Sequence, residues 1–99
     1  AVQAMNNATG AAVALDPQLD RAWYGLGLVL IRQQRYDEAV AALKRNTELQ
    51  PMSPYGWYQL ARVQVDRQQP DEARKIIRHL KGFEPKVADQ LVRETGLDP

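Results

Sequence analysis

The feature that most constrains the fold of this chain is a repeat with a step of 34 residues. Trp23 recurs as Trp57, and Leu26 recurs as Leu60. Other positions keep the same offset: Asp37 and Asp71, Glu38 and Glu72, Ala39 and Ala73, the prolines Pro17, Pro51 and Pro85, and the apolar series Leu15, Leu49 and Phe83. Chance does not produce so many coincidences at one offset. The chain is therefore expected to fold as a series of similar units.

Within each unit the apolar residues recur at steps of three and four, which is the spacing of a helix face. No run alternates with period two for long enough to suggest a strand, so the predicted fold class is all-α. Ser53 followed by Pro54 is a typical helix start, and Gly82 and Gly96 are typical helix ends. The pattern predicts helices over about 1–15, 19–33, 37–49, 54–68, 70–81 and 85–95.

The step and its residues resemble the tetratricopeptide repeat family. The matching residues of the first unit are Trp23, Leu26, Gly27, Leu30, Ala39, Leu43 and Pro51, and those of the second are Trp57, Leu60, Ala61, Ala73, Ile77 and Pro85. The resemblance implies antiparallel helix-turn-helix repeats stacked into a short right-handed α-solenoid. It also implies that both tryptophans are packing residues.

The resemblance divides the chain, taken as a single domain over 1–99, into four parts. Residues 1–19 would be the second helix of a truncated preceding repeat, 20–53 and 54–87 would be repeats, and 85–96 would be a C-terminal capping helix. Glu94 stands where a further unit would need its leucine. We therefore expect the last helix to cover the stack with Glu94 facing water.

Two glycines stand within the helix predicted over 19–33, and each costs about 1 kcal/mol relative to alanine in a helix interior. In this family the two helices of a unit pack very close. The resemblance therefore implies that Gly27 faces the partner helix, at Ala39. Gly25 falls at a variable position of the repeat and has no such explanation.

Composition limits the possible functions. A net charge of +1 gives no electrostatic case for a nucleic acid or an anionic membrane, although Arg32, Arg35, Arg62 and Arg67 are the residues that such an alternative would use. The longest apolar stretch, over 25–31, is far below the roughly 20 residues that span a bilayer. No cysteine is present, and His79 is the single histidine. We therefore expect no catalysis, no metal and no cofactor.

The family lines a concave groove with the first helix of each unit. By alignment, the partner-binding positions here are Arg21, Tyr24, Leu28, Ile31 and Arg32 in the first unit, and Tyr55, Tyr58, Arg62, Val65 and Asp66 in the second. Each set follows steps of three and four, so each lies on one helix face. Leu28, Ile31 and Val65, if exposed together, would form an apolar patch of the kind that marks an interaction site.

These residues predict a protein-interaction module that binds a peptide or partner helix in the groove. Tyrosines and aliphatic residues would bury apolar groups, while Arg21 and Arg62 would orient a polar or acidic end. The lysine and asparagine clamp with which some members hold acidic chaperone tails is absent, since Tyr24, Leu28, Tyr58 and Arg62 occupy its positions. The alternative is self-association into a homo-oligomer, or docking onto another domain of the parent protein.

Overall fold

A computed structural model describes the backbone of residues 18–98 and the side chains of residues 21–98. This part of the chain holds five helices and no strand: α2 (Gln18–Arg32), α3 (Tyr36–Leu49), α4 (Pro54–Asp66), α5 (Pro70–Lys81) and α6 (Pro85–Thr95). The all-α fold class is confirmed. The helix predicted over 1–15 lies outside the described residues.

The turn between α2 and α3 and the turn between α4 and α5 have the same backbone geometry. Gln34 and Gln68 both adopt left-handed backbone, with φ of 60° and 62°. After α2, the Arg35 amide bonds to the carbonyl of Leu30, and after α4 the Gln69 amide bonds to that of Gln64, both at 2.8 Å. This is the Schellman pattern that ends a helix. It explains why α4 ends at Asp66 rather than near residue 68.

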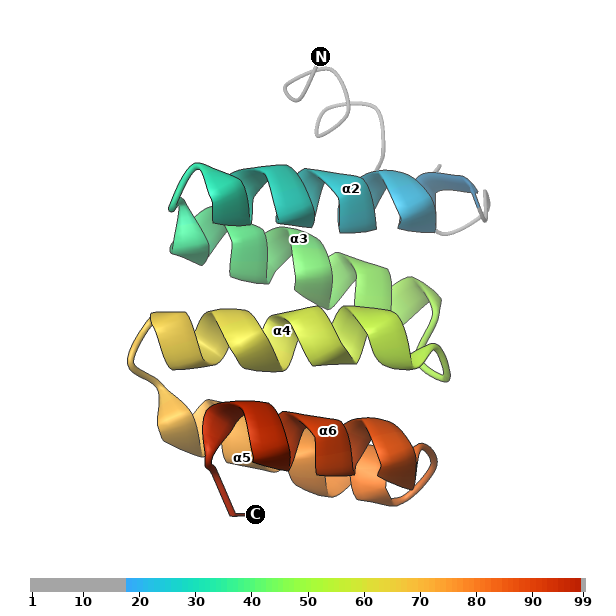
Figure 1. The fold of residues 1–99 in the computed structure, drawn as a ribbon. Coiled ribbons are helices and arrows are strands. Elements are labelled where there is room, and N and C mark those ends of the chain that lie inside the picture. Colours follow the sequence, from blue (N-terminus) through green and yellow to red (C-terminus); the bar gives the residue numbers. More distant parts are fainter. Residues whose placement is uncertain (1–17, 99) are drawn as a thin grey trace.

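The helices form two layers (Figure 1). One layer holds α2, α4 and α6, and the other holds α3 and α5 behind them. Each helix packs against the next one in the chain, and α4 also contacts α6. This arrangement is that of a helical repeat solenoid. It leaves the outward side of α2, α4 and α6 as one continuous face.

The core runs between the two layers. Its largest fully buried side chains are Leu43, Val63, Ile77, Leu80 and Leu91. Four fully buried alanines lie among them: Ala39, Ala61, Ala73 and Ala88. Small side chains at these positions let neighbouring helices approach closely, so that dispersion contacts accumulate.

Gly27 lies at such a close approach to α3, as expected, and the residue it meets most closely there is Leu43. A Cβ atom on Gly27 would lie 2.7 Å from Cγ and 2.8 Å from Cδ2 of Leu43. Leu43 is one helical turn beyond Ala39 and is fully buried. A Cβ on Gly25 would meet nothing within 4 Å, and the structure gives no reason for that glycine.

A second glycine makes room for a buried polar side chain. Asn46 of α3 is buried, and a Cβ on Gly56 of α4 would lie 2.0 Å from its Oδ1 atom. The absence of a side chain at Gly56 therefore lets α3 and α4 pack around an amide. The start of α4 is held close to the end of α3 in this way.

The two tryptophans pack differently. Trp23 is buried, and its Nε1 atom has no acceptor among the described residues. The Nε1 atom of Trp57 donates to the carbonyl of Pro51 at 2.9 Å, and its ring lies 4.5 Å from the ring of His79. His79 in turn lies 5.2 Å from Phe83. The single histidine thus joins an aromatic cluster between α4 and α5.

Candidate partner-binding surface

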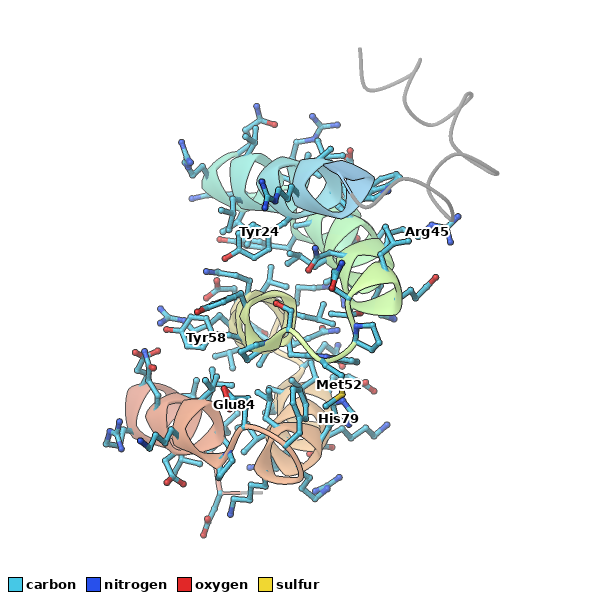
Figure 2. The ribbon with its side chains drawn as sticks, turned by 90° about the vertical axis from the view of Figure 1, so that its right-hand side faces the viewer. Tyr24, Arg45, Met52, Tyr58, His79 and Glu84 are labelled. Carbon is cyan, nitrogen blue, oxygen red and sulfur yellow. The ribbon has the colours of Figure 1, made fainter. Side chains whose placement is uncertain are left out.

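The ten predicted groove residues all belong to α2 and α4. Figure 2 shows Tyr24 and Tyr58 on the side away from α3 and α5. Five of the ten are exposed (Arg21, Arg32, Tyr55, Arg62 and Asp66), and five are half-buried (Tyr24, Leu28, Ile31, Tyr58 and Val65). The structure gathers some of them into two groups, one at each end of this face.

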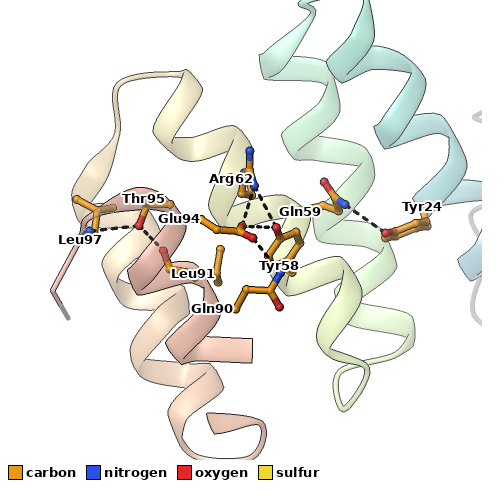
Figure 3. Close-up of polar contacts among 9 residues, drawn as sticks. All are labelled: Tyr24, Tyr58, Gln59, Arg62, Gln90, Leu91, Glu94, Thr95 and Leu97. Atoms are coloured by element: carbon orange, nitrogen blue, oxygen red, sulfur yellow. Dashed lines mark hydrogen bonds and ion pairs between the residues drawn. The ribbon is translucent and has the colours of Figure 1, made fainter. Parts of the chain in front are cut away.

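The first group surrounds a pocket between the beginnings of α2 and α4. The pocket has a volume of about 380 Å³ and is lined by Arg21, Tyr24, Asn46, Ser53, Tyr55 and Gly56. Three predicted residues, Arg21, Tyr24 and Tyr55, therefore meet there. The Tyr24 hydroxyl accepts a long hydrogen bond of 3.5 Å from the Gln59 side chain (Figure 3). Tyr55 is the most open of the three, with 68% of its surface exposed.

The second group joins α4 to α6 (Figure 3). The Tyr58 hydroxyl donates a short hydrogen bond to Oε1 of Glu94. The Nη1 atom of Arg62 donates to the same carboxylate oxygen at 2.8 Å and to the Tyr58 hydroxyl at 3.0 Å. Gln90 donates to the other carboxylate oxygen at 2.9 Å. One carboxylate is thus held by a phenol, a guanidinium and an amide.

These hydrogen bonds fix the protonation states of the second group. The bond from Tyr58, followed by that from Gln90, lowers the pKa of Glu94 below its ordinary value of 4.5, and Arg62 acts in the same direction. The bond to Glu94 and burial raise the pKa of Tyr58 above 10.0. The bond to Tyr58 is the main cause that raises the pKa of Arg62. Near neutral pH the group therefore holds an ion pair and a neutral phenol.

Glu94 has a partner that the sequence did not predict. The sequence predicts that Glu94 faces water, and the residue is indeed exposed, but its carboxylate also pairs with Arg62 of α4 at 2.8 Å. Arg62, predicted to meet an acidic partner, meets an acidic residue of its own chain. The sequence could have indicated this pair, because a capping helix that stacks on α4 places its polar residues beside those of the α4 groove face.

The predicted apolar patch is smaller than expected. Ile31 and Val65 pack partly against the hydrophobic core rather than standing free, and Leu28 is half-buried. Arg32 and Asp66, at the far ends of α2 and α4, line neither of the two groups. The open part of the face is therefore the pocket around Tyr24 and Tyr55.

The other side of the stack carries a second cavity, of about 410 Å³. It is lined by Lys44, Thr47, Glu48, Trp57, Leu60, Gln64, Glu72, Lys75, Ile76 and His79. Its lining includes apolar side chains together with acidic and basic ones. Within residues 18–98, no cluster of three metal-ligating side chains is found, and no helix is long and apolar enough to cross a membrane.

Comparison with known proteins identifies the family. A family model described as anaphase-promoting complex, cyclosome, subunit 3 matches residues 4–80. That family consists of tetratricopeptide-type repeats. No curated protein and no solved structure matches the chain. The family match covers most of the chain, including both tryptophans and most or all of each of the first five predicted helices. The chain therefore belongs to this family of tetratricopeptide-type repeats.

Proposed function

We propose that this chain is a protein-interaction module whose α2–α4 face binds an extended segment or a helix of another protein. Repeat families of this type are associated with protein–protein interaction and are generally non-catalytic scaffolds. The observation that carries the proposal is the open pocket lined by Arg21, Tyr24 and Tyr55. Tyrosine and arginine are the residue types that most often dominate binding energy at protein interfaces.

The pocket supports binding of a side chain rather than of a flat surface. Its volume of about 380 Å³ lies in the range of pockets that enclose small ligands. The exposed ring of Tyr55 adds apolar area at its edge, and a partner that covers this ring gains the free energy of removing that area from water. A partner segment would therefore insert a side chain between α2 and α4.

The other end of the face is less open to a partner. Tyr58 and Arg62 already bind Glu94 of α6, so a ligand that used them would first break those hydrogen bonds. Among the ten predicted residues, we therefore assign partner contact first to Arg21, Tyr24 and Tyr55. Tyr58 and Arg62 hold α6 in place.

Selection from a random peptide library tests this proposal. A double variant with Tyr24→Ala and Tyr55→Ala should bind the selected peptides at least about tenfold more weakly, since each truncation at a central contact costs about 1–3 kcal/mol. Tyr58 is left intact in this test because its truncation would also loosen α6.

Met52→Ala is the matched control, since Met52 is 69% exposed and lies on the opposite side of the stack from Tyr24 in Figure 2. It should leave affinity unchanged. If the double variant binds the selected peptides as tightly as the natural chain, the partner surface lies elsewhere.

Self-association is the second candidate. Val29, Met52 and Tyr55 are the exposed large apolar residues of the described chain, and a second copy could cover them. Sedimentation across about a hundredfold range of concentration separates the two candidates, because association follows mass action. A mass that doubles with concentration, and reverts in the Tyr55→Ala variant, would favour a homo-oligomer over a separate partner.

A further inference from the structure

We propose that the pocket between α2 and α4 binds the carboxylate of a glutamate side chain of the partner, held by Arg21 and Tyr24. This inference rests on the proposed function and names the chemistry of its ligand. It starts from the way the chain binds one of its own carboxylates at the next junction of the stack.

At the α4–α6 junction, this helix face binds a carboxylate. There a tyrosine hydroxyl and an arginine guanidinium hold the carboxylate of Glu94, which a neighbouring helix presents. A charged acceptor makes such hydrogen bonds roughly twice as strong as neutral ones. The ligand in this case is a glutamate on a helix, which is also the kind of group that a partner protein can offer.

The α2–α4 junction carries the same two donors in a related arrangement. Tyr24 is the equivalent of Tyr58 at the 34-residue step. Leu28 stands at the place of Arg62, so that position supplies no charge. Arg21 supplies it instead, because it lies one turn before Tyr24 on the same helix face, whereas Arg62 lies one turn after Tyr58. Arg21 and Tyr24 both line the pocket.

Neither donor is engaged by a carboxylate of the described residues. Arg21 is exposed and forms no ion pair within the described part of the chain, where Arg35, Arg45, Arg62, Arg67 and Arg74 each pair with a carboxylate. The Tyr24 hydroxyl accepts one long bond and donates to none of the described residues.

Among the described residues that line the pocket, none carries an acidic side chain. The pocket thus presents a cation and a hydroxyl donor without a counter-charge, which is complementary to an anion.

The flanking residues favour a glutamate that is followed or preceded by an apolar residue. Tyr55 lies at the same pocket with most of its ring in water. A carboxylate on Arg21 and Tyr24 would place the adjoining part of the partner against this ring. The expected ligand is therefore a short segment in which glutamate has an aliphatic neighbour.

Three capped tripeptides test the inference by nuclear magnetic resonance titration of the full chain. They are acetyl-Leu-Glu-Leu-amide, acetyl-Leu-Gln-Leu-amide, and acetyl-Leu-Gln-Leu with a free C-terminal carboxylate. The glutamate peptide should bind about fivefold or more tightly than the glutamine peptide, because only its side chain forms charge-assisted hydrogen bonds. Its shifts should centre on the amides of Tyr55 and Gly56.

Variants locate the preference. Arg21→Gln should abolish the difference between the glutamate and glutamine peptides, and Tyr24→Phe should reduce it. Arg78→Gln, which changes an exposed arginine of α5, is the matched control and should leave the difference intact.

Four results would overturn the inference: equal binding of the two capped peptides, tighter binding of the free C-terminal carboxylate, a preference that survives Arg21→Gln, or no shift with any peptide at several millimolar. The proposed function is tested separately, since it fails only if library peptides ignore the Tyr24 and Tyr55 substitutions.

Discussion

Two glycines of α2 stand two residues apart, and their surroundings differ completely. A side chain at Gly27 would collide with Leu43, which is fully buried and cannot move aside without disturbing the core. A side chain at Gly25 would project into open space. The same residue type therefore serves close packing at one position and only weakens the helix at the other.

This contrast gives a paired prediction. Gly25→Ala should raise the free energy of unfolding by about 0.5–1 kcal/mol through helix propensity. Gly27→Ala should lower it by about 1–2 kcal/mol, because overpacking against Leu43 costs about 1–3 kcal/mol and exceeds the gain in propensity. Urea denaturation of both variants measures the two changes, and each variant controls for the other. If both variants raised the free energy of unfolding by the same amount, Leu43 would accommodate the added methyl group without cost.

At the scale of elements, α6 is the helix whose attachment depends on both packing and charge. Ala88 and Leu91 are fully buried, and Glu94 adds its bonds to Tyr58 and Arg62. The charge term depends on pH because the pKa of Glu94 is lowered in the folded protein. A lowered pKa stabilises the fold above the unfolded value, and this stabilisation is lost as pH falls through the folded value.

Glu94→Gln tests this dependence. The natural chain should be more stable than the variant above about pH 5, where Glu94 is charged in both the folded and unfolded states. The difference should shrink below pH 4.5, the ordinary pKa of the group. Denaturation of both proteins from about pH 3 to 7 measures it, and comparison of the two removes the effect of the other carboxylates. A difference independent of pH would mean that the carboxylate contributes no charge-dependent stability.

The sequence predicts elements better than it predicts contacts between them. Helix positions follow from the spacing of apolar residues and from local signals such as Pro54 in the first turn of α4 and the left-handed Gly96 after α6. The Ser53 side chain makes no capping hydrogen bond. The neighbour of Gly27 and the partner of Glu94 depend on the direction of side chains across two packed helices. A shift of one helical turn changes such a contact, and spacing along the chain alone does not resolve it.

Three of the ten groove residues, Arg21, Tyr24 and Tyr55, are brought to one pocket, and the residue step predicted their common side. It did not predict the pocket, which also needs Gly56 and Asn46 to bring α3 and α4 together. The half-burial of Ile31 and Val65 was missed for a related reason, because the depth of a groove position depends on the neighbouring helix.

For the whole molecule, the important feature is that helices contact only near neighbours in the stack. Stability in such arrays is approximately a sum of unit terms and nearest-neighbour interfaces. Leu91 of α6 and Leu43 of α3 are both fully buried but lie near opposite ends of the described array. Loss of either side chain should therefore weaken mainly its own region.

Leu91→Ala and Leu43→Ala form a matched pair. Each should lower the free energy of unfolding by about 2–5 kcal/mol. Amide hydrogen exchange should accelerate most in α5 and α6 for the first variant, and most in α2 and α3 for the second. If both variants accelerated exchange uniformly over all helices, the array would unfold as one cooperative unit and not pair of helices by pair of helices.

The different settings of the two tryptophans have an optical consequence. Trp23 is buried in the α2–α3 pair without an acceptor among the described residues, and Trp57 packs against His79 in the α4–α5 pair, with the two rings tilted at 57°. An enclosed indole emits at shorter wavelength than a partly solvated one, so the two tryptophans should differ in emission. Each half of the stack thus carries its own fluorophore, so a Trp23→Phe variant would report only on the half that holds Trp57. Unfolding of the two halves could be followed separately without any attached dye.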